Sequence, residues 1–119
     1  MPAMNKKLLL KQLISTLDAD SADDQEVIDY LNNYEFIKIN RTAEIQDGSL
    51  VQLENQGNIN WYFMIPVEGG KFLTIDDKVI MSITPFSKLG GEMINRIVGD
   101  EFEVQAKSSI QTYKVLHLC

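Results

Sequence analysis

The side chains that could do chemistry in this sequence are mostly carboxylates, and they gather in one short segment. Its acids are Asp18, Asp20, Asp23, Asp24 and Glu26. Carboxylate oxygens at this density are ligands that hard cations such as Mg²⁺ prefer. The same spacing also suits a solvated turn before a helix, because acids in a first helical turn favour the helix dipole. We interpret the segment as an acidic turn and predict no metal ligands.

The other reactive side chains lack the neighbours that catalysis requires. The single histidine, His117, has no Cys/His cluster around it, and Ser108-Ser109 has no nucleophile-elbow pattern. Gly90-Gly91 lacks the spacing of a phosphate-binding loop. The single cysteine, Cys119, excludes an intramolecular disulfide, which fits a reducing cytosol. The sequence therefore predicts a protein that is not an enzyme, with no catalytic residues and no cofactor.

Size and charge limit the partners that this chain can have. Its 119 residues, 45% of them hydrophobic, suffice for one compact domain with a small appendage. A formal net charge of −6 repels phosphate backbones, which argues against direct nucleic-acid binding. The apolar run near the start is broken by Lys11 and Gln12, and no run can span a bilayer. We expect a cytoplasmic protein without a membrane partner that is a monomer or a weak homo-oligomer.

Two amphipathic helices are predicted around the acidic turn. Leucines recur at helical spacing within residues 4–17. Ser21, followed by Asp24, resembles a capping box at the start of a second helical stripe that runs to Tyr34. The two helices form a short hairpin, and we expect residues 1–47 to comprise this hairpin and its connector.

After residue 47 the hydrophobic pattern changes from helical to alternating, which predicts strands. Tight turns at Gln56-Gly57-Asn58 and at Asp76-Asp77 each join two strands into a hairpin. Two further strands follow a helix. The pattern predicts an α+β fold in which a short N-terminal helical hairpin precedes an antiparallel sheet packed on one helix. Residues 48–119 form this second unit.

The helix between the strands is predicted near residues 88–98. Ser87 can cap its start. Asn95 and Gly99 both tolerate a left-handed backbone, so the helix can end at either point. Its apolar face consists of Leu89, Met93, Ile94 and Ile97. This face can lie on the sheet, and core packing accounts for it without any active site.

The segment ITPFSKLGGEMINRIVGDEFEV resembles the C-terminal domain of the bacterial Gre factors, the GreA and GreB transcript-cleavage and elongation factors that act on RNA polymerase. The matching positions are Ile83, Ser87, Leu89, Gly90, Arg96, Val98, Gly99 and Asp100. The upstream segment WYFMIPVEGGKFLTIDDKVIMSITP also resembles the smaller relatives of that family. The resemblance covers about residues 48–118 and implies an FKBP-like fold for them.

The resemblance further implies that the strand-to-helix loop touches the polymerase. The loop residues are Thr84, Pro85, Phe86, Ser87, Lys88, Leu89 and Gly90. The sequence departs from the family at Lys88, where a proline is usual, at Glu92, where a small residue is usual, and at Asn95, where the helix ends in glycine. These departures alter the surface around the loop but do not exclude the fold.

The N-terminal arm of the family is implied only in shortened form. Gre factors carry a long antiparallel coiled coil whose acidic tip enters the polymerase secondary channel and supports a catalytic Mg²⁺. Here a first helix of about 14 residues reaches only roughly 20 Å. The tip motif of acids flanking an aromatic is missing from the sequence. We therefore expect no stimulation of transcript cleavage.

Two functions remain open at this point. The first is a non-enzymatic protein that binds bacterial RNA polymerase, resembles a Gre elongation factor without the long arm, and modulates transcription or competes at the secondary channel. The alternative is an FKBP-like domain that binds peptides or isomerises prolyl bonds, unrelated to transcription. Trp61, Tyr62 and Phe63 could then line a pocket, although adjacent strand residues point to opposite faces. The acidic hairpin favours the first function.

Overall fold

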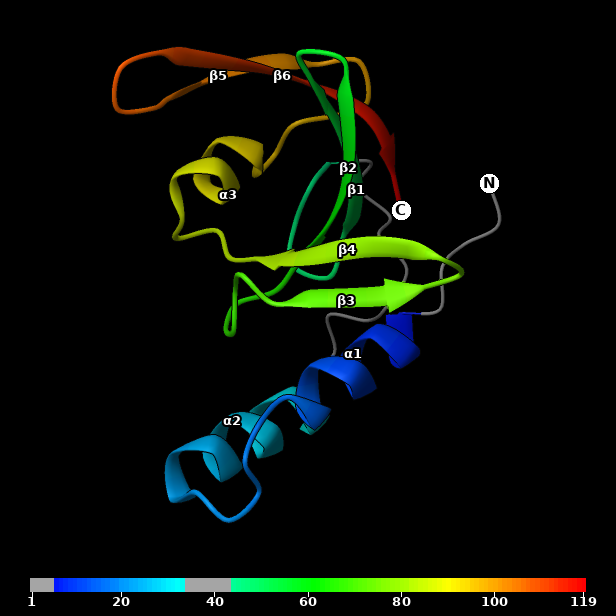
Figure 1. Cartoon of the computed structure of the whole chain (residues 1–119), viewed down its shortest axis with the longest axis vertical. Coiled ribbons are helices and arrows are strands. Elements are labelled where there is room, and N and C mark those ends of the chain that lie inside the picture. The colour runs from blue at the N-terminus through cyan, green and yellow to red at the C-terminus, as the bar shows by residue number, and fades with distance from the viewer. Residues whose placement is uncertain (1–5, 34–43) are drawn as a thin grey trace.

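The computed structural model of the chain describes residues 6–33 and 44–119 and has the α+β class that the sequence predicts. The helices are α1 (Lys6–Ser15), α2 (Ala22–Asn33) and α3 (Lys88–Met93). The strands are β1 (Leu50–Asn55), β2 (Asn58–Met64), β3 (Phe72–Ile75), β4 (Lys78–Ile83), β5 (Glu101–Gln105) and β6 (Ile110–Leu118). Figure 1 shows α1 and α2 as a hairpin that lies past strand β3, at one end of the sheet. Helix α3 lies on the concave side of the sheet, beneath β5.

The described strands form one mixed sheet in the order β3-β4-β2-β1-β6-β5. The pairs β3–β4, β2–β1, β1–β6 and β6–β5 are antiparallel, as expected. The pair β2–β4 is parallel, with Trp61 opposite Ile80, which differs from the antiparallel sheet that the sequence predicts. The difference arises because residues 65–71 carry the chain from β2 past the position beside it, so that β3 becomes the edge strand. Strand β4 then returns between β3 and β2 and runs in the same direction as β2.

Both predicted hairpin turns are confirmed. Gln56 and Gly57 have φ values of 51° and 81°, and Asp76 and Asp77 have φ values of 51° and 63°. Positive φ at both central residues gives a two-residue turn whose twist matches that of the strands it joins.

A first hydrophobic cluster lies between the helical hairpin and one face of the sheet. Leu9 and Leu13 of α1 and Leu31 of α2 are fully buried there. They belong to the same cluster as Leu73 of β3 and Ile80 of β4. Burying each such side chain contributes roughly 1.5–3 kcal/mol, so this cluster anchors the hairpin to the sheet.

A second hydrophobic cluster lies on the other face, under α3. Met93 of α3 is fully buried in it, beside Phe102 of β5 and Val115 of β6. Strand β2 serves both clusters because its side chains alternate. Trp61 and Phe63 belong to the first cluster and Tyr62 to the second.

The helical hairpin is short. Helix α1 has 10 residues and α2 has 12, which correspond to lengths of about 15 and 18 Å. The longest dimension of the chain is 41 Å. The predicted helix start before Lys6 and the predicted end at Tyr34 lie outside the described residues. In the described ranges no helix is both long and apolar enough to cross a membrane.

Candidate docking loop

The loop between β4 and α3 is held by hydrogen bonds around Ser87. The Gly90 N–H donates to Ser87 Oγ at 3.0 Å, which confirms Ser87 as the N-cap of α3. The Ser87 hydroxyl donates to the Thr84 carbonyl at 2.9 Å, and the Ser87 N–H reaches the same carbonyl at 3.2 Å. One carbonyl and one hydroxyl thus tie the strand end to the helix start.

Gly90 is required by a close approach of two backbone segments. A Cβ atom added to Gly90 would lie 1.8 Å from the Thr84 carbonyl oxygen and 2.8 Å from Ser87 Oγ. A Cβ added to the neighbouring Gly91 would meet only the Pro85 oxygen, at 3.3 Å. The first glycine therefore permits the loop to close on itself, whereas the second occupies looser space.

Phe86 projects from this loop into solvent. Its side chain is 84% exposed, the largest exposure among the described large hydrophobic residues. Lys88 beside it is exposed, and Leu89 is half-buried against the second cluster. The ring therefore does not fold over the helix start, and a hydrogen-bonded loop presents it.

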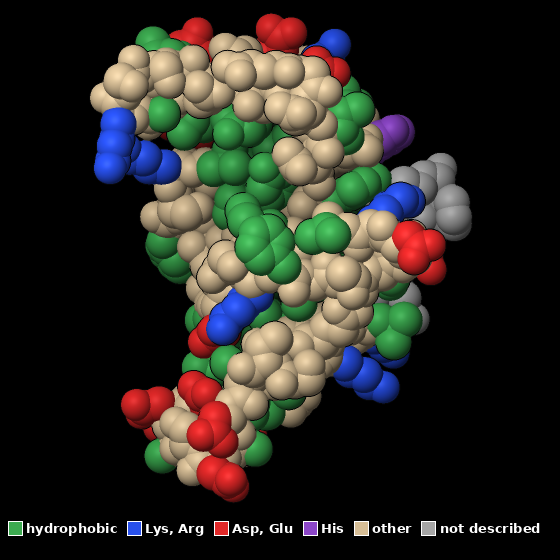
Figure 2. Space-filling view, in the orientation of Figure 1, with side chains coloured by type: hydrophobic (Ala, Val, Ile, Leu, Met, Phe, Trp, Pro, Cys, Tyr) green, Lys and Arg blue, Asp and Glu red, His purple; other side chains and the backbone are tan. Residues whose placement is uncertain are grey.

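A groove of about 430 Å³ adjoins the loop. Its lining residues are Gly69, Gly70, Met81, Ser82, Ile83, Thr84, Ser87 and Leu89. None of the three consecutive aromatic residues of β2 lines it. Figure 2 shows hydrophobic side chains gathered over the middle of the face that carries α3, with acidic side chains at its upper edge and at the tip of the helical hairpin.

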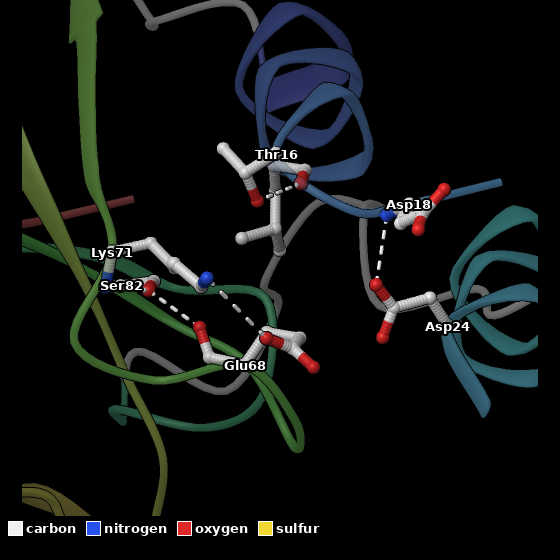
Figure 3. A network of polar contacts seen from close by, with 7 residues as sticks. Thr16, Asp18, Asp24, Glu68, Lys71 and Ser82 are labelled. Carbon is white, nitrogen blue, oxygen red and sulfur yellow. Dashed lines mark hydrogen bonds and ion pairs between the residues drawn. The ribbon is translucent and has the colours of Figure 1, made fainter. Parts of the chain in front are cut away.

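The floor of this groove is fixed by the buried Ser82. Its hydroxyl donates to the Glu68 carbonyl at 2.7 Å and accepts from the Lys71 N–H at 2.9 Å (Figure 3). The Lys71 ammonium also lies 3.9 Å from the Glu68 carboxylate. The polar group of Ser82 is thus satisfied inside the protein, so it is a structural element of the groove.

Helix α3 ends earlier than its apolar spacing predicts. It stops at Met93, and Asn95 has a left-handed φ of 69°, so the helix ends at the first of the two expected points. The Asn95 N–H donates to the Ile45 carbonyl, and the Ile45 N–H donates to the Arg96 carbonyl, both at 2.9 Å. This pairing with a distant segment replaces a further helical turn. The prediction that Ile97 belongs to the helix and its buried face was wrong, since Ile97 is 46% exposed.

Glu92 and Asn95, where the sequence differs from the Gre pattern that it resembles, both have local roles in this fold. The Arg96 guanidinium lies 3.4 Å from the Glu92 carboxylate and 5.1 Å above the Phe102 ring. Asn95 supplies the left-handed residue that glycine supplies elsewhere. Both substitutions therefore fit this fold.

Two carboxylates of the acidic turn, those of Asp18 and Asp24, accept hydrogen bonds from its own backbone. The Asp18 N–H donates to Asp24 Oδ2 at 2.7 Å (Figure 3). The Asp20 N–H donates to Asp18 Oδ1 at 2.9 Å. The Asp24 N–H reaches Ser21 Oγ at 3.4 Å, which forms one half of the predicted capping box. The described residues contain no group of three His, Cys, Asp or Glu side chains arranged around an ion. The turn lies at the hairpin tip, away from α3 (Figure 1).

Some side chains have electrostatic surroundings that the sequence does not reveal. Burial raises the pKa of Tyr62, and the nearby Tyr113 raises it further. Burial lowers the pKa of Lys6, and Cys119 partly offsets this effect. His117 stacks on Trp61 with ring centroids 6.3 Å apart and planes 14° apart. This stack joins strands that are not neighbours, so no local sequence pattern indicates it.

Comparisons with known proteins define the fold but not the family. No family model matches the sequence. No curated protein matches it either. The fold is similar to a solved structure of the transcription factor Gfh1, with a TM-score of 0.51 and 19% identity, over 95% of this chain and 81% of that one.

Two other solved structures show weaker likeness. Gfh1 of Thermus aquaticus gives a TM-score of 0.49 and 18% identity, over 95% of this chain and 81% of that one. The elongation factor GreA/GreB of Nitrosomonas europaea gives a TM-score of 0.47 and 12% identity, over 94% of this chain and 88% of that one. The chain thus has a Gre-like fold, on the basis of the similarity at 0.51.

Proposed function

We propose that this chain is a member of the Gre family that associates with bacterial RNA polymerase as a non-enzymatic binding protein. The observation that carries the proposal is the fold shared with the transcription factor Gfh1 across 95% of the chain. The motif positions that resemble Gre factors lie in and after the β4–α3 loop and add a second, local argument.

We infer that the residues Thr84–Gly90 form the docking surface, with Phe86 as its anchor. A ring that is 84% exposed on a hydrogen-bonded loop loses little conformational freedom when it binds. Aromatic residues at the centre of an interface often account for much of the binding free energy. Lys88 lies at the rim, where a charge chiefly affects the association rate and its salt dependence.

The short helical hairpin determines the effect that we propose for binding to the polymerase. In this proposal residues 48–119 dock and residues 1–47 form an arm too short for chemistry inside the polymerase. Occupying the site without reaching the catalytic metal would modulate transcription or exclude long-armed Gre factors. No observation favours the prolyl isomerase alternative, since the aromatic residues of β2 are divided between the two faces of the sheet.

The test is binding of the full chain to purified bacterial core RNA polymerase. Phe86→Ala should weaken binding by about 30-fold, which corresponds to about 2 kcal/mol. Phe72→Ala is the matched control, because Phe72 is a second phenylalanine that is 71% exposed but lies outside the loop. It should bind as the unchanged chain does.

Two results would count against the proposal. If the unchanged chain fails to bind core polymerase, the association itself is wrong. If it binds and a folded Phe86→Ala protein binds equally well, the loop is not the docking surface. Lys88→Ala should mainly slow association and flatten its dependence on salt.

A further inference from the structure

The candidate docking loop places an apolar projection beside an apolar recess. Phe86 projects from the loop, with a side chain that is 84% exposed. The groove of about 430 Å³ starts next to this ring, since Thr84 and Ser87, which flank Pro85-Phe86, both line it. Exposed apolar features that lie this close together mark an interaction site more often than scattered ones do.

The groove has the size and the chemistry to hold a phenyl ring. Met81, Ile83 and Leu89 supply its larger apolar side chains, and none of its lining residues is ionisable. An apolar cavity of about 150 Å³ is enough for a benzene molecule, so this groove has room for one ring. The Ser82 and Ser87 hydroxyls are hydrogen-bonded within the chain, so an entering ring leaves them with their partners.

The ring of the same chain does not fill its own groove. The Ser87 hydroxyl and N–H both donate to the Thr84 carbonyl, at 2.9 and 3.2 Å, and these bonds fix the loop between them. The close approach of Gly90 to Thr84 holds the same conformation. Phe86 therefore stays in solvent while the groove beside it stays open.

A surface that carries a ring beside a groove is complementary to a copy of itself. When a second copy is turned by 180° and faces the first, each ring stands over the groove of the other copy. Because the ring and the groove adjoin, both contacts form between the same two molecules, and the assembly closes as a dimer. An unrelated partner would have to offer a groove and a ring at the same spacing, whereas a second copy always has them.

The charges of the molecule permit this contact. Lys88 is the single charged residue within Thr84–Gly90, and it is exposed, so its ammonium can stay in water at the rim. Figure 2 shows most acidic side chains of this face at its upper edge and at the tip of the helical hairpin. Repulsion between exposed charges is largely screened beyond about 10 Å at about 0.1 M salt. The net charge of −6 is therefore not concentrated at the contact.

We propose that this chain forms a two-fold dimer in which Phe86 of each copy enters the groove of the other, against Met81, Ile83 and Leu89. The dimer is transient, because one ring in each direction buries less than the roughly 1,200 Å² of a stable interface. It covers the ring that we propose to dock on the polymerase, so self-association withholds the docking loop. That regulatory step rests on the proposed function, whereas the dimer itself does not.

The test is sedimentation equilibrium of the full chain without polymerase. The unchanged chain should dimerise with a dissociation constant between about 10 and 1,000 µM, as a transient interface does. Phe86→Ala removes the ring and Met81→Lys places a charge in the groove, and each should weaken the homodimer by about 30-fold or more. Ile110→Ala is the matched control, because Ile110 is 55% exposed on β6, which two strands separate from β4. It should dimerise as the unchanged chain does.

A mixture of the two variants identifies the contact. Phe86→Ala keeps its groove and Met81→Lys keeps its ring, so a heterodimer of the two retains one intact contact and should be about tenfold tighter than either homodimer. If circular dichroism shows that Met81→Lys unfolds, Leu89→Lys replaces it, since Leu89 lines the same groove.

Three results would overturn the proposal. They are an unchanged chain that stays monomeric at about 1 mM, a mixture that associates no better than its separate variants, and an Ile110→Ala protein that loses the dimer as Phe86→Ala does. A chain that dimerises in this pattern but does not bind core polymerase would support the dimer and refute the polymerase association.

Discussion

Gly90 shows how a single residue determines the shape of the candidate docking loop. Its missing side chain lets the Thr84 carbonyl approach the start of α3, where Ser87 also binds that carbonyl. The resemblance to Gre factors includes a glycine at this position, and the contact supplies a physical reason for it. The loop can present Phe86 only because its two ends meet this closely.

We predict that Gly90→Ala destabilises the fold by about 1–3 kcal/mol, because a methyl group 1.8 Å from a backbone oxygen forces a backbone shift. Gly91→Ala should stay within about 1 kcal/mol, because a small clash at 3.3 Å is offset by the better helix propensity of alanine. Urea unfolding of both variants measures the difference. Equal losses would mean that the close approach at Thr84 does not exist.

Tyr62 gives the fold a specific sensitivity to alkaline pH. Its folded-state pKa is raised by burial, whereas an unfolded tyrosine titrates near about 10. Above that pH the unfolded chain loses this proton more readily than the folded chain, so the free energy of unfolding falls as pH rises. Lys6 acts in the opposite direction, because its lowered folded-state pKa makes the unfolded chain bind more protons at alkaline pH.

We predict that Tyr62→Phe loses less stability than the unchanged chain between pH 8 and about pH 11, because it removes the tyrosine that ionises in the unfolded state. Denaturant unfolding at both pH values gives the comparison, and Lys6 contributes equally to both proteins. Curves that shift by the same amount would show that the Tyr62 hydroxyl is not effectively buried.

At the scale of elements, the turns could be predicted from the sequence and the long-range pairings could not. Gly57 and the aspartates Asp76 and Asp77 accept positive φ more readily than most residues, so local chemistry reveals both hairpins. The end of α3 depends on hydrogen bonds between Asn95 and Ile45, which are far apart in sequence. The helical spacing of Ile97 suggests a longer helix. That spacing contains no information about Ile45, whose hydrogen bond with Asn95 ends the helix.

In the candidate site, too, the local features could be predicted from the sequence and the long-range contacts could not. The capping role of Ser87 follows from its type and place before a helix, and the structure confirms it. Outside that site, the hydrogen bond that Gln12 of α1 accepts from the Thr74 N–H of β3 has no sequence signal, since glutamine is ordinary on a helix and Thr74 is 62 residues away. The parallel pairing of β2 with β4 likewise depends on how one connection folds, which residue types do not specify.

At the hairpin turns we predict that adding a glycine and removing one change the free energy of unfolding in opposite directions. Asp77→Gly should raise the free energy of unfolding by up to about 1 kcal/mol, because glycine accepts its φ of 63° without strain. Gly57→Ala should lower it by roughly 1–2 kcal/mol, because φ is 81° and the added methyl group would touch nothing, which leaves only backbone strain. Thermal or urea unfolding tests both, and a gain from Gly57→Ala would contradict the turn geometry.

At the scale of the whole molecule, the reach of the hairpin decides which activity is possible. The acidic turn is borne on helices of about 15 and 18 Å, in a chain whose longest dimension is 41 Å. The carboxylates of Asp18 and Asp24 are also hydrogen-bonded within the turn. In the proposed association, helices of this length would keep the tip close to the rest of the bound protein.

We therefore predict that the purified chain does not stimulate cleavage of backtracked RNA in arrested bacterial transcription complexes. The assay follows shortening of the RNA 3′ end with and without the protein, and a long-armed GreB serves as the positive control. Protein-dependent shortening that disappears in Asp23→Ala or Asp24→Ala would contradict the prediction and assign chemistry to the turn.

The strand order has a consequence for synthesis on the ribosome, where the N-terminal part of a chain emerges first. Strands β1 to β4 can assemble once residue 83 has emerged, but β1 then lacks the neighbour on its other side, because that neighbour is β6, at residues 110–118. Until then a nascent chain displays Val51 and Leu53, which are buried in the finished protein. Translation that stops between β4 and β6 should thus release a fragment prone to aggregation and chaperone capture.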